Sequence, residues 1–170
     1  MKIARIEAIP LRIPFTAGGP SSAGAWGAAG QQAVDSLIVS VTTDTGVVGW
    51  GETFGFTAIP AVKAAIDSIL APECIGRDAT QLGKLSLDLQ KKFHIFGRSG
   101  AFIYGLSAID IALWDIAGKV TSKPVYQLLG GSDAISLRSY ASLTRYAKPH
   151  LVEENVARAL GSGFRHLKRT

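Results

Sequence analysis

Residues 104–131, YGLSAIDIALWDIAGKVTSKPVYQLLGG, decide the fold, because they combine a long apolar stripe with defined stop signals. The stripe has the i, i+3, i+4, i+7 spacing of a helix that packs on a core. It consists of Leu106, Ile109, Ala112, Leu113, Ile116, Ala117 and Val120. Ile111 and Trp114 widen the apolar surface, so we expect this helix to be covered on more than one side. Pro124 opens a short second helix, and Gly130 closes it with a left-handed cap.

Two aspartates and a tryptophan in this helix are interpreted as structural. Asp115 lies nearly opposite the apolar stripe and four residues before Lys119, where an exposed ion pair contributes at most about 0.5 kcal/mol. Asp110 and Trp114 share the same helix. An apolar stripe with two aspartates is more often core packing with surface pairing than chemistry, so we expect none of the three to be catalytic.

A small antiparallel sheet is predicted before the helix. Residues 2–14 alternate until two prolines interrupt them, which indicates an edge strand. Residues 35–43, DSLIVSVTT, alternate more clearly, and the turn residues Asp44-Thr45-Gly46 lead into a partner strand at 47–53. Because strands precede helices without βαβ alternation, residues 1–131 are predicted to form an α+β domain: a three-stranded antiparallel sheet with a helical bundle.

Two more helical segments lie between the hairpin and residue 104. In the first, Thr57 is a plausible N-cap and Pro72 marks the end. Its apolar face consists of Val62, Ala65, Ile66, Ile69 and Leu70. The second runs over about residues 80–93, with Asp88 placed to pair with Lys91 or Lys92. Its apolar face consists of Leu82, Leu85, Leu89 and Phe93.

The pattern changes after Gly131. A short β-rich run at 135–143 precedes a helical pattern at 150–160, and FRHLK at 164–168 reads as another strand. This βαβ unit would leave sheet edges and an apolar face uncovered if it stood alone. We therefore expect residues 132–170 to be the first, incomplete βαβ of a (β/α)₈ barrel, a fold that needs about 250 residues in full.

Composition and charge narrow the functional classes. The net charge of +5 arises in residues 119–170, where nine Lys and Arg face three Asp and Glu. These basic residues are scattered without interleaved aromatics, so a nucleic-acid partner is not expected. The N-terminus lacks the hydrophobic segment of a signal peptide, and no apolar run approaches the roughly 18 residues of a membrane span, so we expect a cytoplasmic protein. The single cysteine, Cys74, is expected to act as a small buried or half-buried hydrophobe.

The pattern of residues 104–131 resembles the last helix of the N-terminal capping domain in the mandelate racemase and muconate lactonizing branch of the enolase superfamily. The resemblance extends over the whole chain, and GFRHLKRT is similar to the barrel strand that carries a Lys-x-Lys pair in this family. It assigns a catalytic role to Lys168 and places Thr170 where the second lysine is expected. A threonine hydroxyl does not suit the role of base for a carbon acid near neutral pH. The alternative for Lys168 is a strand-end lysine that merely reaches solvent.

The same resemblance assigns two substrate-specificity loops. The first is the glycine-rich segment 16–32, TAGGPSSAGAWGAAGQQ, which begins at Thr16 and has Trp26 as its one large contact group; the alternative is a disordered connector. The second follows the third strand. It comprises Glu52, Thr53, Phe54 and Phe56. Glu52 can equally be an ion-pair partner at the rim.

The resemblance implies the N-terminal portion of a Mg²⁺-dependent enzyme that abstracts the proton α to a carboxylate, in a racemisation, dehydration or cycloisomerisation. Its substrate would be a small carboxylic or sugar acid, and we expect a homo-oligomer with neither nucleic-acid nor membrane partners. The family's metal ligands lie on later barrel strands, so no metal ligand is expected in this chain, which alone would be inactive. The alternative is a non-catalytic capping-domain module for oligomerisation or partner binding.

Overall fold

The structure is a computed structural model that describes residues 1–15, 18–19, 33–53, 56–132 and 136–169. The chain divides into two compact units, Met1–Arg12 with Asp35–Ser132, and Ile13–Val34 with Asp133–Thr170. The sequence assigned all of residues 1–131 to the first domain, whereas this division groups residues 13–34 with the C-terminal part of the chain.

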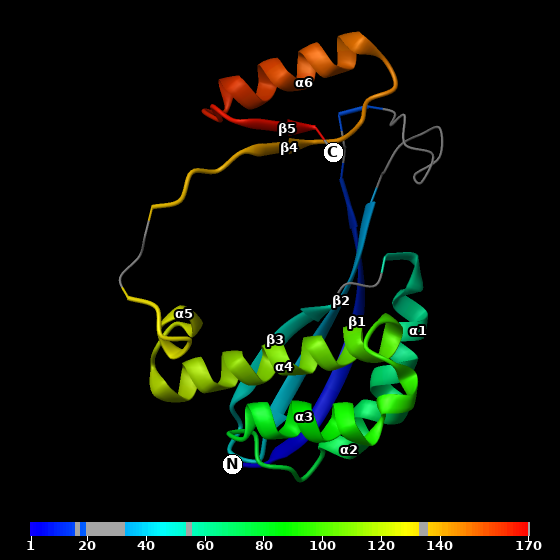
Figure 1. Cartoon of the computed structure of the whole chain (residues 1–170), viewed down its shortest axis with the longest axis vertical. Helices are drawn as coiled ribbons and strands as arrows, with labels where there is room; N and C mark the ends of the chain where they lie inside the picture. Colours follow the sequence, from blue (N-terminus) through cyan, green and yellow to red (C-terminus); the bar gives the residue numbers. More distant parts are fainter. Residues whose placement is uncertain (16–17, 20–32, 54–55, 133–135, 170) are drawn as a thin grey trace. The chain divides into compact units, whose positions relative to one another are not determined.

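The first unit contains a three-stranded antiparallel sheet (Figure 1). Its strands are β1 (Ile3–Pro14), β2 (Ala33–Thr43) and β3 (Val48–Thr53), in the order β1-β2-β3. The predicted hairpin at Asp44-Thr45-Gly46 is confirmed: the Gly46 amide donates to the Thr43 carbonyl at 3.0 Å, and Gly46 has a φ of 84°. Glycine adopts this left-handed conformation without steric cost. The turn therefore joins β2 to β3 as an antiparallel pair.

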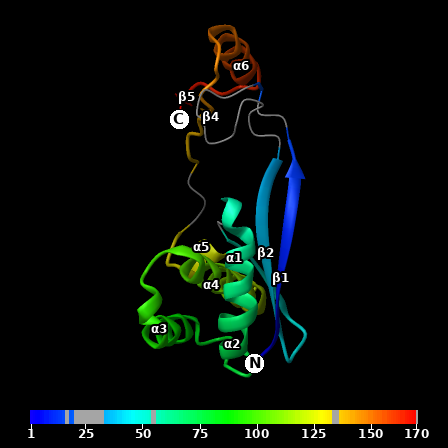
Figure 2. The ribbon, with the colours of Figure 1, turned by 90° about the vertical axis from the view of Figure 1, so that its right-hand side faces the viewer.

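The sheet has one covered face, because the helices of the first unit lie on the same side of it (Figure 2). Leu37, Val39 and Val41 of β2 are fully buried on this side. On β3 the buried positions are Gly49, Gly51 and Thr53, whereas Trp50 and Glu52 are exposed. Burial thus alternates with period 2 along β3, whereas Ser36 and Ser40 on the other face of β2 are buried as well.

The first helical segment is longer than predicted. It begins with a 3₁₀ turn η2 (Phe56–Ala58) and continues through α1 (Ile59–Ala65), the π-helical turn η3 (Ile66–Leu70) and α2 (Ala71–Cys74). Pro72 does not end the helix, as we expected; it lies in the first turn of α2, directly after the π turn. A π turn changes the local hydrogen-bond register, so the missing N–H and the ring of proline are tolerated there. Thr57 is not the N-cap either, because α1 begins after Ala58 without a side-chain cap.

The second helix, α3 (Leu82–Lys92), is followed by a 3₁₀ turn η4 (His94–Phe96). Asp88 pairs with Arg77 and with Lys84, whose Nζ lies 2.7 Å from the carboxylate, and not with Lys91 or Lys92 as expected. Lys92 instead reaches Glu73 at 2.6 Å. Hydrogen bonds from Lys84 and Arg77 lower the pKa of Asp88. The sequence spacing identified Asp88 as an ion-pair residue but could not show the approach of Arg77 from the preceding loop.

The longest helix, α4 (Gly100–Thr121), carries the predicted stripe and is followed by α5 (Val125–Leu128). Five stripe residues are buried in the core: Leu106, Ile109, Ala112, Leu113 and Ile116. The predicted cover on more than one side is present, because α4 contacts α1 and α3 as well as β3. The side chain of Ile111 and that of the stripe residue Val120 are nevertheless 46% and 53% exposed. By length and composition α4 could cross a membrane, which corrects the expectation that no apolar run reaches that length. A helix buried in a protein core can have the same length and apolar composition, and α4 packs one face on the sheet.

Close backbone contact joins α4 to β3. A Cβ atom added at Gly51 would lie 2.0 Å from the carbonyl oxygen of Ala108, and one at Gly49 would lie 2.0 Å from that of Ala112. Both alanines are fully buried. Glycine on the strand and alanine on the helix therefore let the two backbones approach closely.

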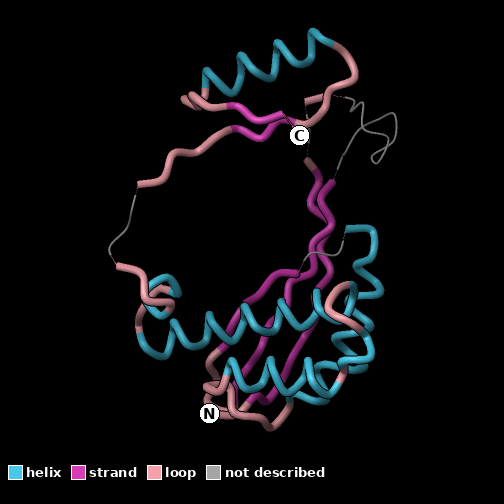
Figure 3. The backbone as a smooth tube through the Cα atoms, in the orientation of Figure 1, coloured by secondary structure: helices cyan, strands magenta, loops and turns pink. Residues whose placement is uncertain are grey.

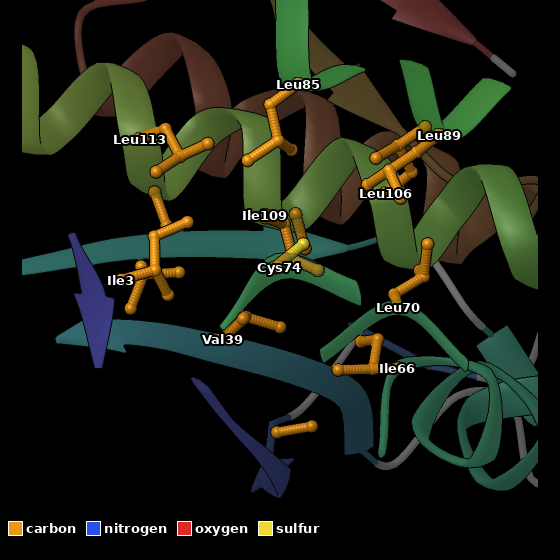
Figure 4. Close-up of a cluster of buried hydrophobic side chains, with 14 of the residues drawn as sticks. Ile3, Val39, Ile66, Leu70, Cys74, Leu85, Leu89, Leu106, Ile109 and Leu113 are labelled. Carbon is orange, nitrogen blue, oxygen red and sulfur yellow. The ribbon is translucent and has the colours of Figure 1, made fainter. Parts of the chain in front are cut away.

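Four elements supply the core of the first unit (Figure 4). The labelled side chains come from the sheet (Ile3, Val39), the α1–α2 segment (Ile66, Leu70, Cys74), α3 (Leu85, Leu89) and α4 (Leu106, Ile109, Leu113). Cys74 is fully buried, as expected, and burial raises the pKa of its thiol to about 12. It therefore acts as a packing residue.

Each of the helices α4 and α5 is followed by a left-handed residue that caps its C-terminal end. Gly130 has a φ of 87°, and the Gly131 amide donates to the Tyr126 carbonyl at 2.8 Å, which confirms the predicted stop. After α4 the same position is taken by Ser122, with a φ of 53°. The Lys123 amide closes this cap by donating to the Gly118 carbonyl at 3.0 Å.

Ser122→Gly is expected to raise the free energy of unfolding by about 0.5–1 kcal/mol, because the left-handed region costs an L-residue about 1–2 kcal/mol and the flexibility of unfolded glycine offsets part of the gain. Urea denaturation measures the change. The control is Ser107→Gly, the same substitution at an exposed interior position of α4, which should lower stability by roughly 0.5 kcal/mol. Equal losses in both variants would contradict the strain at Ser122.

The second unit contains one βαβ element (Figure 3). Strand β4 (Ala141–Leu143) and strand β5 (Leu167–Arg169) pair in parallel, and helix α6 (Pro149–Gly161) connects them. The predicted strand–helix–strand order after Gly131 is confirmed, although both strands are shorter than the sequence pattern.

Candidate functional site

The described part of the predicted second specificity loop is held by hydrogen bonds. The side chain of Glu52 accepts a hydrogen bond from Ser36 Oγ at 2.5 Å. Thr53 is buried, and its Oγ1 donates to the Tyr104 carbonyl at 2.6 Å, which ties the end of β3 to α4. Among the described residues Glu52 takes part in no ion pair, so the alternative of a rim salt bridge is not seen there. Phe54 and the side chain of Phe56 lie outside the description.

A cleft of about 330 Å³ lies where the end of β1 and the start of β2 meet the start of α1. Its walls are mostly apolar and consist of Pro10, Leu11, Arg12, Asp35, Thr57, Ile59 and Pro60. Arg12 Nη1 lies 3.8 Å from the Asp35 carboxylate, and the Arg12 side chain is 76% exposed. This long, solvated pair leaves the guanidinium free to contact a carboxylate. Thr57 in its wall follows the second predicted loop in the sequence, but no cleft was predicted at these residues.

The predicted catalytic lysine lies on the parallel strand pair of the second unit. Lys168 is exposed on β5, opposite Ser142 of β4. Its Nζ lies 5.8 Å from the ring centroid of Tyr140, within cation–π range. Thr170 falls outside the described residues, so the structure places the first position of the expected Lys-x-Lys pair and not the second. Tyr140 is a contact that the sequence analysis missed.

Little of the predicted first specificity loop is described. Thr16 and Trp26 lie outside the described residues, whereas Gly18 and Gly19 are described and contact α6.

The two aspartates of α4 have structural partners, as expected. Asp115 Oδ2 accepts the Trp50 amide at 2.8 Å and the Lys119 ammonium at 2.7 Å. Lys119 Nζ also donates to the Val48 carbonyl at 2.7 Å, so the pair joins α4 to the backbone of β3. Burial raises the pKa of Asp110, and a hydrogen bond from Trp114 partly opposes the rise.

These carboxylates do not fit a magnesium site. Mg²⁺ requires several converging oxygen ligands in near-octahedral geometry. No group of three His, Cys, Asp or Glu side chains that could hold a metal occurs in the described ranges. Glu52 and Asp115 are each engaged with partners of their own, Ser36 for the first and Trp50 with Lys119 for the second.

Comparison with known proteins decides the family. Residues 20–130 match the profile described as "Mandelate racemase / muconate lactonizing enzyme, N-terminal domain". The chain belongs to this family. The predicted capping-domain fold, a three-stranded antiparallel sheet with helices, is thereby confirmed.

Three relatives show how far the similarity extends. Arabinonate dehydratase of Saccharolobus solfataricus is 33% identical over 138 residues, which cover 79% of this chain and 37% of that protein. The crystal structure of the 3,6-anhydro-D-galactonate cycloisomerase from Zobellia galactanivorans has a TM-score of 0.80 and 30% identity, covering 99% of this chain and 42% of that one. A racemase from Streptomyces coelicolor A3(2) with bound magnesium has a TM-score of 0.81 and 28% identity, with 98% and 46% covered. The chain spans less than half of each relative's length.

Proposed function

We propose that the chain is the N-terminal part of a Mg²⁺-dependent enolase-superfamily enzyme that abstracts the proton α to the carboxylate of a small sugar acid. The match of residues 20–130 to the family's N-terminal domain carries the proposal. The names of the arabinonate dehydratase and of the anhydrogalactonate cycloisomerase support the substrate class. Bound magnesium in the Streptomyces racemase supports the cofactor, which would stabilise the negative charge formed when the proton leaves.

In this proposal Lys168 supplies a fixed positive charge to the substrate carboxylate. Its place on a parallel strand suits that role, because catalytic residues of barrels lie at the ends of such strands. The ring of Tyr140 beside Nζ attracts the ammonium group and restricts the conformations of the lysine side chain. Thr170 is poorly suited to remove the proton, so we assign the base to another residue.

The first unit is proposed to select the substrate. The cleft beside Arg12 and Thr57 combines an apolar wall with a guanidinium, a combination that can accept the carbon chain and a carboxylate or hydroxyl group of a sugar acid. The residues of the two predicted specificity loops would complete this selection.

The described carboxylates do not form a metal site, so we expect the 170-residue chain alone to lack both a tight Mg²⁺ site and enolisation activity. Titration calorimetry with Mg²⁺ and deuterium exchange at the α-carbon of a panel of sugar acids measure the two properties. Saturable micromolar Mg²⁺ binding together with exchange by the chain alone would contradict this expectation.

The chain extended by the barrel segment that its relatives carry should catalyse the exchange with Mg²⁺. There Lys168→Ala should lower the exchange rate by about 10²–10³, the usual effect of losing one charge-stabilising group. Lys123→Ala, which removes an exposed lysine after α4, is the control and should leave the rate unchanged. No exchange with any acid of the panel, or equal rates for both variants, would overturn the proposed function.

A further inference from the structure

We propose that Asn155 is a positioning residue, which fixes the chain at Gly18–Gly19 on helix α6. The inference rests on the proposed function, in which residues 16–32 belong to the substrate-selecting part of the enzyme. All of the residues that carry it lie in the second unit.

The amide of Asn155 is buried and fully used. The residue is 5% exposed, and its Nδ2 donates to the Gly18 carbonyl at 3.1 Å and to the Leu151 carbonyl at 2.7 Å. Its Oδ1 accepts a hydrogen bond from Arg158 Nη1 at 2.9 Å. One of the two amide protons thus reaches a residue 137 positions earlier in the sequence. Because a buried amide without partners is costly, the contact with Gly18 is part of what permits an asparagine at this helix position.

The two glycines fit the contact sterically. A Cβ atom added at Gly18 would lie 2.2 Å from Asn155 Oδ1, and one added at Gly19 would lie 2.9 Å from Leu151 Cδ1. Their φ angles of 84° and 133° are also conformations that L side chains rarely adopt. The pair Gly18-Gly19 therefore meets both requirements of this site, a left-handed backbone and a close approach to α6.

Helix α6 is also followed, after residues 162–166, by β5, the strand that carries Lys168. The same helix therefore supports the anchored glycines at one point and the proposed catalytic strand at its end. This arrangement gives Asn155 a functional consequence: it sets where the segment after Gly19 starts relative to the strand that binds the substrate carboxylate.

Chymotrypsin cleavage after Phe15, followed by mass spectrometry, tests the anchor in the 170-residue chain. Phe15 is exposed, and a protease must bind several residues on both sides of the cleaved bond in extended form, so attachment of Gly18 to α6 should slow this cleavage. Asn155→Asp keeps the size of the side chain but removes both donated hydrogen bonds. It should increase the cleavage rate after Phe15 on the order of tenfold, as expected for the loss of a hydrogen bond to a buried group. Ser162→Ala, which removes a hydroxyl bound to the Arg158 carbonyl at the end of α6, is the control and should leave the rate unchanged.

A double-mutant cycle separates the anchor from a general effect on α6. Gly18→Ala disturbs the contact from the other side without changing the helix. It should accelerate the cleavage in the wild-type background, and by a clearly smaller factor in the Asn155→Ala background, where the space occupied by Oδ1 is vacated. Independent effects of the two substitutions, or new cleavage within α6 without any change after Phe15, would overturn the proposal. Neither substrate nor Mg²⁺ takes part in this measurement, so its failure is distinguishable from failure of the proposed function.

Discussion

Gly51→Ala is expected to lower the free energy of unfolding of the first unit by about 3 kcal/mol or more, at the upper end of what overpacking a core costs. The added methyl group would lie 2.0 Å from the Ala108 carbonyl oxygen, so the backbone of α4 or β3 has to move. A flexible side chain makes room for a new atom at little cost, whereas a helix backbone held by its own hydrogen bonds moves only at a large cost. Urea denaturation followed by circular dichroism measures the loss.

The control for this substitution is Gly83→Ala in α3. A Cβ atom at Gly83 meets no atom within 4 Å, and alanine is the better helix former by up to about 1 kcal/mol. This variant should be as stable as the wild type or slightly more stable. If Gly51→Ala were as well tolerated as Gly83→Ala, the close approach of α4 to β3 would be wrong.

Ile109→Ala is the second change with a large expected effect, a loss of about 2–5 kcal/mol in the free energy of unfolding. Ile109 is fully buried in the core of the first unit, so truncation removes apolar contacts and leaves a cavity. Ile111→Ala provides a matched comparison, because it is the same substitution two positions along the same helix at a residue that is 46% exposed. There the loss should stay below about 1 kcal/mol.

Denaturation of both isoleucine variants under the same conditions decides which face of α4 is the core face. Equal losses would mean that the side of α4 with Ile111 is covered as fully as the side with Ile109. A larger loss for Ile111→Ala would contradict the packing described above.

Local patterns predicted the first unit well, because its strands and helices are set by residues close together in the sequence. The β2–β3 hairpin followed from strict alternation around Asp44-Thr45-Gly46, and the buried stripe of α4 followed from its helical period. The βαβ order after Gly131 was likewise readable from the pattern. The family resemblance, which the profile match confirms, rested on the same long helix.

Features that depend on neighbours distant in the sequence were not predictable. Proline is usually a reliable stop signal, yet the π turn before Pro72 lets the helix continue to Cys74. Gly49 and Gly51 were predicted only as part of the strand at 47–53. Their spacing matches that of Ala108 and Ala112 on the facing helix, and this match of small residues was the signal available for close packing.

The candidate site was predictable only in part. Lys168 was identified through its resemblance to a family motif, whereas Arg12 and Asp35 meet at one cleft because β1 ends and β2 begins beside α1. Asn155 carries no local signal at all, since a single asparagine in a helical pattern gives no indication of a partner 137 residues away.

The Asp115–Lys119 pair has a consequence for how the protein behaves among other copies of itself. Strand β3 lies at the border of the sheet, where unpaired N–H and C=O groups can template a strand from another molecule. Asp115 occupies the outward N–H of Trp50, and Lys119 occupies the outward C=O of Val48. A foreign strand would have to displace two charge-assisted hydrogen bonds before it could pair there. Through Asp115 and Lys119, helix α4 thus protects the protein against aggregation by strand addition. From the sequence alone, these two residues were predicted to form only a weak surface ion pair.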